Sequence, residues 1–194
     1  TTIDPVGREI TETYDWSGNL VKITRYGDNT TPIENFEEIT FEYDQLNRKT
    51  KLTDAKGIVT TYCYDERNLL TEQNYGVTGS DTMVYNDLGQ LIRKTDRKGN
   101  VITFTYDQIG RNTKAVHFTS VANYNTGVFD HSVDLAYDNR GNAVRIANQN
   151  LIEHYMYDYA NRVITLERRL KDAAIRQQIA DRVDSQGADT QVFS

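Results

Sequence analysis

The side chains most able to carry out chemistry are few and scattered along the chain. They are one cysteine, Cys63, and three histidines, His117, His131 and His154. The histidines lack the His-x-x-x-His or His-Glu-x-x-His spacing of a metal site, and a single cysteine forms neither an internal disulfide nor a cysteine-based zinc site. Cys63 falls on the polar face of a predicted strand with no histidine placed to activate it, so we interpret it as an inert thiol. We predict no metal site and no cofactor.

The segment Asp130-His131-Ser132 has the composition of a catalytic triad. Neighbouring residues of a strand point to opposite faces, so these three are not expected to align as orienting acid, base and nucleophile. The sequence has no phosphate-binding loop and no nucleophile elbow. We therefore predict no catalytic residue and no enzyme activity.

Tyrosine is the most conspicuous residue type, with 13 copies in the chain. Aromatic ladders bind sugars or choline in cell-wall-binding repeats, but those modules rely on tryptophan, and this chain has only Trp16. We favour a structural stacking role for the tyrosines, because aromatic cross-strand pairs stabilise sheets. A glycan-binding or cell-wall-binding module is the alternative.

Composition narrows the choice of partners. The 194 residues carry 22 Lys and Arg against 28 Asp and Glu, a formal net charge of −6. Nucleic-acid binding requires clustered cations, so we expect no nucleic-acid partner. No apolar run approaches the length of a membrane span, and the start, which lacks a basic-then-apolar leader, suggests a segment excised from a longer protein.

An internal repeat sets the architecture. Tyr followed by Asp or Asn recurs as Tyr14-Asp15, Tyr43-Asp44, Tyr64-Asp65, Tyr85-Asn86, Tyr106-Asp107, Tyr137-Asp138 and Tyr157-Asp158. Successive tyrosines are 29, 21, 21, 21, 31 and 20 residues apart, so the basic unit has about 21 residues. The two long steps contain polar, irregular stretches near residues 26–34 and 119–130, which we interpret as loop insertions.

Each repeat also predicts a turn. The fourth residue after each Tyr is always Gly or Asn, namely Gly18, Asn47, Asn68, Gly89, Gly110, Gly141 and Asn161. These residues adopt a positive φ most easily, and an Asp three positions earlier suits a type I turn capped by its side chain. Calcium ligation by the recurring Asp-x-x-Gly is not favoured, because single carboxylates in successive turns do not supply 6–8 oxygens.

The strands on either side of the turn alternate with period two. Ile39 and Phe41 share one face with Tyr43, while Thr40 and Glu42 take the other. Each repeat is therefore a β-hairpin with one apolar, aromatic face. We predict an all-β fold, a curved antiparallel sheet of tandem hairpins over residues 1–166. Residues 167–194 form either a short helical cap or a linker, with a frayed end.

The unit Tyr-x-Tyr-Asp-x-x-Gly-Arg, clearest at Phe104–Arg111, resembles the YD repeat of the Rhs family. Arg48, Arg111 and Arg162 match its last position, and the resemblance covers residues 1–166. It implies a spiral β-sheet that closes into a hollow shell. The family includes bacterial Rhs effectors and insecticidal toxin-complex shells, which enclose a C-terminal toxin, and teneurins, which act in cell-surface adhesion.

From this resemblance we expect a structural shell segment of a secreted or cell-surface bacterial protein. Its partners would be the rest of the same polypeptide shell and an enclosed toxin domain, and its exposed strand edges would favour self-association of the isolated piece. Cell-surface adhesion or glycan binding is the alternative function.

Overall fold

The computed structural model describes residues 1–3, 9–26 and 36–171. Within these ranges the fold is almost entirely β, which confirms the predicted class. The strands are β1 (Thr2–Ile3), β2 (Glu9–Tyr14), β3 (Leu20–Tyr26), β4 (Phe36–Tyr43), β5 (Lys49–Thr53), β6 (Val59–Tyr64), β7 (Leu70–Asn74), β8 (Ser80–Tyr85), β9 (Leu91–Thr95), β10 (Val101–Tyr106), β11 (Asn112–Phe118), β12 (His131–Tyr137), β13 (Ala143–Ala147), β14 (Leu151–Tyr157) and β15 (Val163–Leu170). A short 3₁₀ helix, η1 (Gly76–Thr78), and one α-helix, α1 (Val121–Thr126), complete the described elements.

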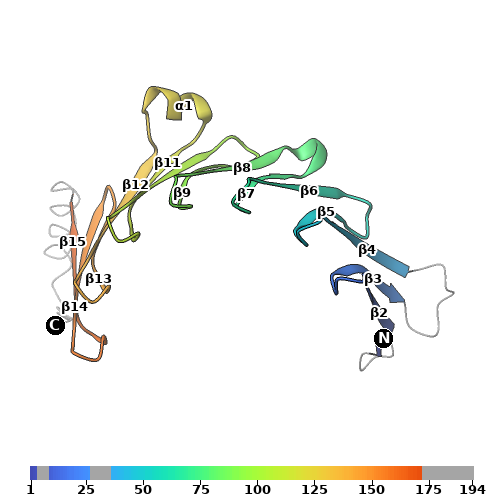
Figure 1. The fold of residues 1–194 in the computed structure, drawn as a ribbon. Coiled ribbons are helices and arrows are strands. Elements are labelled where there is room, and N and C mark those ends of the chain that lie inside the picture. Colours follow the sequence, from blue (N-terminus) through green and yellow to red (C-terminus); the bar gives the residue numbers. More distant parts are fainter. Residues whose placement is uncertain (4–8, 27–35, 172–194) are drawn as a thin grey trace, which may run out of the picture. The chain divides into compact units, whose positions relative to one another are not determined.

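The chain divides into two compact units, residues 1–100 and 101–194. In the first unit, strands β1 to β9 pair antiparallel in sequence order, and in the second unit β10 to β15 do the same. Within each unit the strands form a single twisted layer (Figure 1). This is the meander of tandem hairpins that the repeat predicts.

Each repeated Tyr is the last residue of a strand, and the next strand of its hairpin begins six residues later. In all seven hairpins the pairing register shifts immediately before this Tyr, as a β-bulge does. The bulge accompanies a turn whose fourth residue has positive φ, a geometry that twists and closes a hairpin. The repeat is therefore one hairpin, as predicted.

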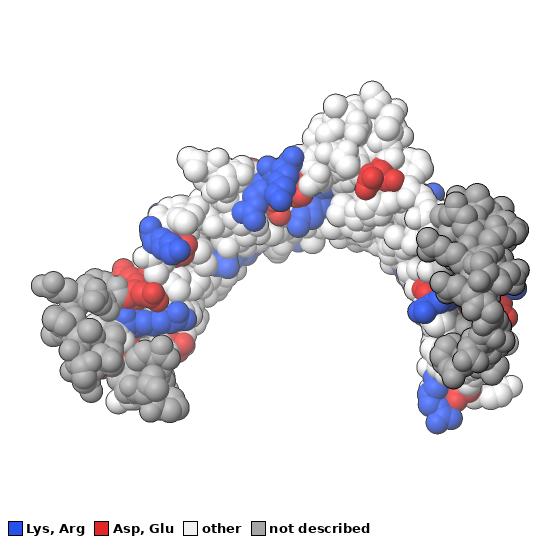
Figure 2. All heavy atoms as spheres, turned by 180° about the vertical axis from the view of Figure 1, so that it is seen from behind, with Lys and Arg blue, Asp and Glu red and all other residues white. Residues whose placement is uncertain are grey.

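Strand register separates an apolar face from a polar one. Ile23 lies opposite Ile39, and Leu135 lies opposite Ile146 on the same face type of the second unit. On the polar face Glu42 lies opposite Lys51, and their side chains form a 2.8 Å ion pair. Acidic and basic side chains lie next to one another in this way along the sheet (Figure 2).

The described residues bury very little. Only Val101 and Ala147 are buried apolar side chains, and only Thr24 and Thr60 are buried polar ones, within the described ranges. A single layer leaves both of its faces accessible, whereas stable domains normally pack two layers around a core. Stability of each unit therefore depends on contacts between neighbouring hairpins within the layer.

Two details differ from the sequence predictions. The last strand, β15, continues past the expected boundary at residue 166 to Leu170, because Glu167 to Leu170 pair with Leu151 to His154. The insertion predicted as irregular at 119–130 contains α1, which begins after an N-cap bond from the Asn123 amide to Ser120 Oγ and ends at Gly127 with φ 74°. Most of the 26–34 insertion and residues 172–194, with the helix or linker expected there, lie outside the described residues.

Candidate functional site

Within each unit, the repeated residues form a set of contacts that join neighbouring hairpins. The Asp of the turn organises its own loop first. In the Asp107 turn, the amides of Ile109 and Arg111 both donate to Asp107 Oδ1, at 3.1 and 2.9 Å. The amide of Gly110, whose φ is 88°, donates to the Asp107 carbonyl at 3.0 Å. The side chain thus caps two amides that the tight turn leaves without a strand partner.

All seven repeats use this device. The same pair of amide bonds forms to Asp15, Asp44, Asp65, Asn86, Asp138 and Asp158. Asp54 and Asp96 repeat it in the turns between hairpins. The positive φ predicted at Gly18, Asn47, Asn68, Gly89, Gly110, Gly141 and Asn161 is present at each of them.

These bonds also set the acidity of the turn carboxylates. The amide bond from Arg111 is the main reason that the pKa of Asp107 lies below its ordinary value, and the Arg111 guanidinium adds to it. The amide of Arg48 lowers the pKa of Asp44 in the same way. Amides and guanidinium groups favour the ionised form because they donate hydrogen bonds to it. The turns are therefore built around charged carboxylates at neutral pH.

Within each unit, tyrosine hydroxyls connect a hairpin to the one before it. Tyr64 Oη donates to the carbonyl of Lys49 at 2.8 Å, and Tyr85 Oη donates to that of Leu70 at 2.8 Å. The same bond, at 2.8–2.9 Å, joins Tyr43 to Leu20, Tyr137 to Asn112 and Tyr157 to Ala143. In every case the acceptor stands six residues after the preceding repeat's Tyr, where the outgoing strand begins. These five hydroxyls therefore join neighbouring hairpins.

The insertions leave this link unchanged. Tyr43 and its acceptor Leu20 are 23 residues apart, and Tyr137 and Asn112 are 25 apart, whereas Tyr64 and Lys49 are separated by only 15. The extra residues leave and rejoin the sheet at the opposite end of the hairpin from the Tyr. Loop length is thus independent of the contact that joins the repeats.

Arginine provides a link in the opposite direction along the chain. Arg111 Nε donates to Asp107 Oδ2 at 2.7 Å within its own turn, and another guanidinium nitrogen reaches the carbonyl of Asp138 in the next repeat at 3.0 Å. The same guanidinium lies over the Tyr137 ring, 4.7 Å from its centroid. Arg48 repeats the arrangement toward the third hairpin, with its guanidinium 4.8 Å from the Tyr64 ring centroid.

Repeats without this arginine connect by other side chains. Asn19 donates to Asn47 Oδ1 at 2.8 Å and Asn142 donates to Asn161 Oδ1 at 2.9 Å. Arg67, which belongs to the turn itself, reaches the carbonyl of Asn86 at 2.6 Å. The motif predicted the arginines at its last position. Arg67 was not predicted, because it lies at a different position of the turn. The carbonyl acceptors were not predicted either, because any residue type offers a backbone carbonyl.

Two of the three histidines lie together, which the sequence did not predict. His117 and His131 lie opposite each other on β11 and β12, and their rings stack with centroids 4.1 Å apart. Asp130 precedes β12, so strand alternation does not separate it from His131, and its carboxylate bonds His131 Nδ1 at 2.7 Å. Ser132, by contrast, pairs with Val116 on the other face. The three residues therefore do not form a triad, although two of them touch.

The remaining candidate residues lie apart from one another. Cys63 is exposed and lies opposite Glu72 on the polar face, as predicted. Among residues 1–3, 9–26 and 36–171, no three His, Cys, Asp or Glu side chains are grouped closely enough to hold a metal ion. No helix in the described part of the chain is long and apolar enough to span a membrane.

The comparisons with known proteins agree with this geometry. The family model described as Teneurin YD-shell matches residues 7–124. No protein of curated function matches the chain. Among solved structures, the Photorhabdus luminescens Tc holotoxin pore aligns with a TM-score of 0.65 and 15% identity, over 79% of this chain and 8% of its own.

Two further complexes align similarly. A TcdB2-TccC3-TEV structure gives a TM-score of 0.68 at 16% identity, over 84% of this chain and 9% of that one, and TcdB2-TccC3 gives 0.66 at 15%, over 79% and 9%. At this level of identity the match shows a shared fold. The chain spans less than a tenth of the length of these solved proteins.

Proposed function

Because the chain belongs to the teneurin YD-shell family, we propose that its hairpin sheet is a wall segment of a larger shell that encloses a C-terminal toxin domain for delivery. The shell role itself is structural. Its proposed partners are the rest of the parent polypeptide and the enclosed domain, and its proposed location is outside the cell or on its surface.

This proposal rests on one observation: the repeated side chains form hydrogen bonds between neighbouring hairpins. Tyr hydroxyls bind the preceding repeat, and Arg or Asn side chains bind the following one. Such links extend a single layer without limit, and they do not build a compact core. A thin, extendable layer suits a wall around a contained volume.

Glycan binding by the tyrosines has less support. The hydroxyls of Tyr43, Tyr64, Tyr85, Tyr137 and Tyr157 are already bonded to backbone carbonyls. Two of these rings, Tyr64 and Tyr137, also lie beneath guanidinium groups. Rings occupied in this way do not offer the open stacking surface that a sugar requires.

Protease protection tests the proposal directly. The parent polypeptide that contains this chain is treated with proteinase K, and digestion of its C-terminal domain is compared with digestion of that domain expressed alone. We expect the enclosed domain to survive at least tenfold longer in the parent protein. Equal rates of digestion would refute enclosure and would direct attention to adhesion at the cell surface.

A matched pair of variants relates protection to this segment. Tyr64→Phe combined with Tyr85→Phe removes two links between repeats and is expected to accelerate digestion of the enclosed domain. Tyr62→Phe, on the same strand as Tyr64, removes a hydroxyl that has no hydrogen bond within the described residues, and is expected to leave digestion unchanged.

A further inference from the structure

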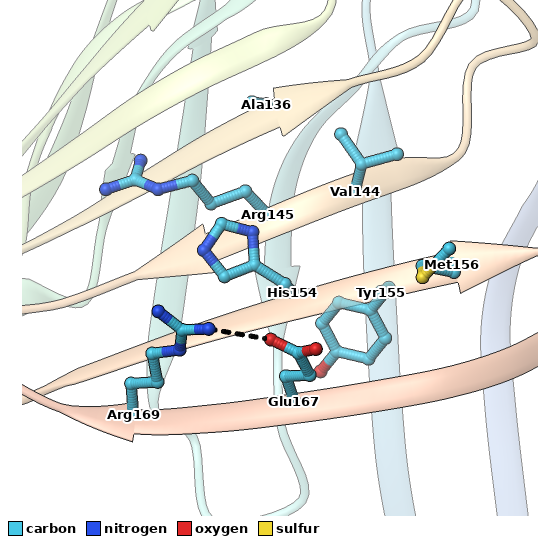
Figure 3. A pocket seen from close by; sticks show the side chains of 8 residues that line it. All are labelled: Ala136, Val144, Arg145, His154, Tyr155, Met156, Glu167 and Arg169. Atoms are coloured by element: carbon cyan, nitrogen blue, oxygen red, sulfur yellow. Dashed lines mark hydrogen bonds and ion pairs between the residues drawn. The ribbon is translucent and has the colours of Figure 1, made fainter.

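A groove lies on the second unit, across strands β12 to β15. It is a shallow, open groove of about 590 Å³, lined by Ala136, Val144, Arg145, His154, Tyr155, Met156, Glu167 and Arg169 (Figure 3). None of these residues belongs to the contacts that join the repeats. The groove is therefore free to act in a way that the wall role does not explain.

Strand register places most of the lining on one face. Ala136 lies opposite Arg145, Arg145 opposite His154, and His154 opposite Glu167, so the four side chains form a row across the sheet. Arg169 stands two residues after Glu167 on the same strand, and therefore on the same face. In Figure 3 the guanidinium groups of Arg145 and Arg169 lie on either side of the His154 imidazole.

The charges in this row do not cancel. Arg169 pairs with Glu167 at 3.2 Å, which neutralises the single carboxylate of the groove. Arg145 has no ion pair or hydrogen bond to any side chain that the structure describes, although elsewhere on this polar face cations such as Lys114 are paired across the strands. An unpaired guanidinium beside an imidazole is a ready site for a carboxylate, which it binds through two parallel hydrogen bonds.

Apolar surface accompanies the cations. Ala136 begins the row, and Met156, on the same face as His154, is 57% exposed. The volume of 590 Å³ also exceeds what a small inorganic anion fills, and falls in the range of sites for larger ligands. The ligand chemistry that fits is therefore anionic and apolar together.

We infer that this groove binds an acidic peptide in extended conformation, with a carboxylate on Arg145 and a neighbouring apolar side chain over Ala136 and Met156. In an extended chain alternate side chains point to the same side, so acidic and apolar residues at alternate positions reach the groove together. This inference goes beyond the proposed shell function and does not depend on it, because it concerns the groove alone.

Fluorescence polarisation with a rhodamine-labelled peptide, Gly-Glu-Ser-Leu-Ser-Glu-Gly, tests the inference on the full chain. We expect saturable binding, and loss of binding when both Glu of the peptide are replaced by Gln. Arg145→Gln should weaken the affinity at least tenfold, because it removes the charge-assisted, two-bond contact with the carboxylate. Glu167→Gln should tighten it about threefold, because it removes the one carboxylate that repels the peptide.

The opposite signs of these two effects separate binding from misfolding, since a damaged fold weakens both variants. Arg25→Gln, which changes an exposed arginine of the first unit, serves as the matched control and is expected to change nothing. Equal binding of the Gln peptide, complete displacement by an equal concentration of inorganic phosphate, or equal effects of Arg25→Gln and Arg145→Gln would each overturn the inference.

Discussion

Arg111 lies over the aromatic ring of Tyr137, with its guanidinium carbon 4.7 Å from the ring centroid, and the two residues belong to consecutive hairpins. The Tyr137 hydroxyl in turn donates to the carbonyl of Asn112, the residue after this arginine. The Tyr137 ring thus has a cation over its face, and its hydroxyl donates a hydrogen bond, both involving the preceding repeat. Cation–π and hydrogen-bond contributions of this kind are each about 1 kcal/mol.

Removing one tyrosine hydroxyl should weaken the sheet measurably. Tyr64→Phe keeps the ring beneath Arg48 and loses only the bond to the Lys49 carbonyl. We expect the free energy of unfolding to fall by about 0.5–1.5 kcal/mol, measured as a lower urea midpoint. Tyr62→Phe is the control, and a loss of equal size there would contradict a specific role for the Tyr64 hydroxyl.

At the left-handed turn position, we expect alanine to destabilise the protein more than asparagine does. Gly141 has a φ of 89°, and a Cβ placed on it meets no atom within 4 Å, so backbone strain is the only cost of a side chain. Gly141→Ala should lower the free energy of unfolding by about 1–2 kcal/mol. Gly141→Asn should cost clearly less, because Asn47, Asn68 and Asn161 occupy the same position with φ of 59–66°. Thermal unfolding of the two variants compares them, and equal midpoints would argue against strain.

Acid should loosen the turns. Because hydrogen bonds hold the folded-state pKa of Asp107 below its ordinary value, its contribution to stability is complete above about pH 4 and is lost as the pH falls through the lowered folded pKa. Asp107→Asn keeps an oxygen for the two amides, as Asn86 does naturally. We expect this variant to be less stable than the parent at pH 7, and the difference to shrink as the pH falls below about 4. A difference that stays constant with pH would contradict the assignment.

The stacked histidines predict a second pH effect in a higher range. Burial, followed by the nearby His131, lowers the pKa of His117. The unfolded chain therefore binds the proton more readily, so stability is complete above about pH 6.5 and decreases as the pH falls below it. His117→Gln should remove this part of the dependence between pH 7 and 5, measured by thermal unfolding. His154→Gln should retain it, and identical pH profiles for the two variants would refute the effect.

The architecture was readable from the sequence because the informative residues carry their own structural preference. Gly or Asn at a fixed distance from Tyr specifies a left-handed turn, and the alternation at Ile39 and Phe41 specifies a strand. These are local signals, and the same spacing recurs in seven repeats. The interpretation therefore does not depend on any single repeat. The same pattern predicts that the turn Asp caps its own loop, and the amide bonds to Asp107 have this geometry. The role of the tyrosines as wall material stays a prediction.

What the sequence concealed depends on contacts between hairpins. The acceptors of the tyrosine hydroxyls are backbone carbonyls at residues as different as Lys49 and Ala143, so no residue type marks them. The helix α1 was missed because its six residues are too short for an apolar periodicity, and only Ser120 and Gly127 signal its ends. The stack of His117 on His131 required the register of β11 against β12, which spans the insertion.

Every link described above has a sense of direction. Tyr43, Tyr64, Tyr85, Tyr137 and Tyr157 each bond to a carbonyl on the preceding hairpin, whereas Arg48 and Arg111 each bond to a carbonyl on the following one. Arg48 and Arg111 are 25% and 30% exposed beneath their neighbours, whereas Arg162, on the last described hairpin, is 79% exposed. During synthesis from the N-terminus, each new hairpin therefore finds its carbonyl and arginine partners already in place on the hairpin before it. The layer can thus be extended one repeat at a time as translation proceeds.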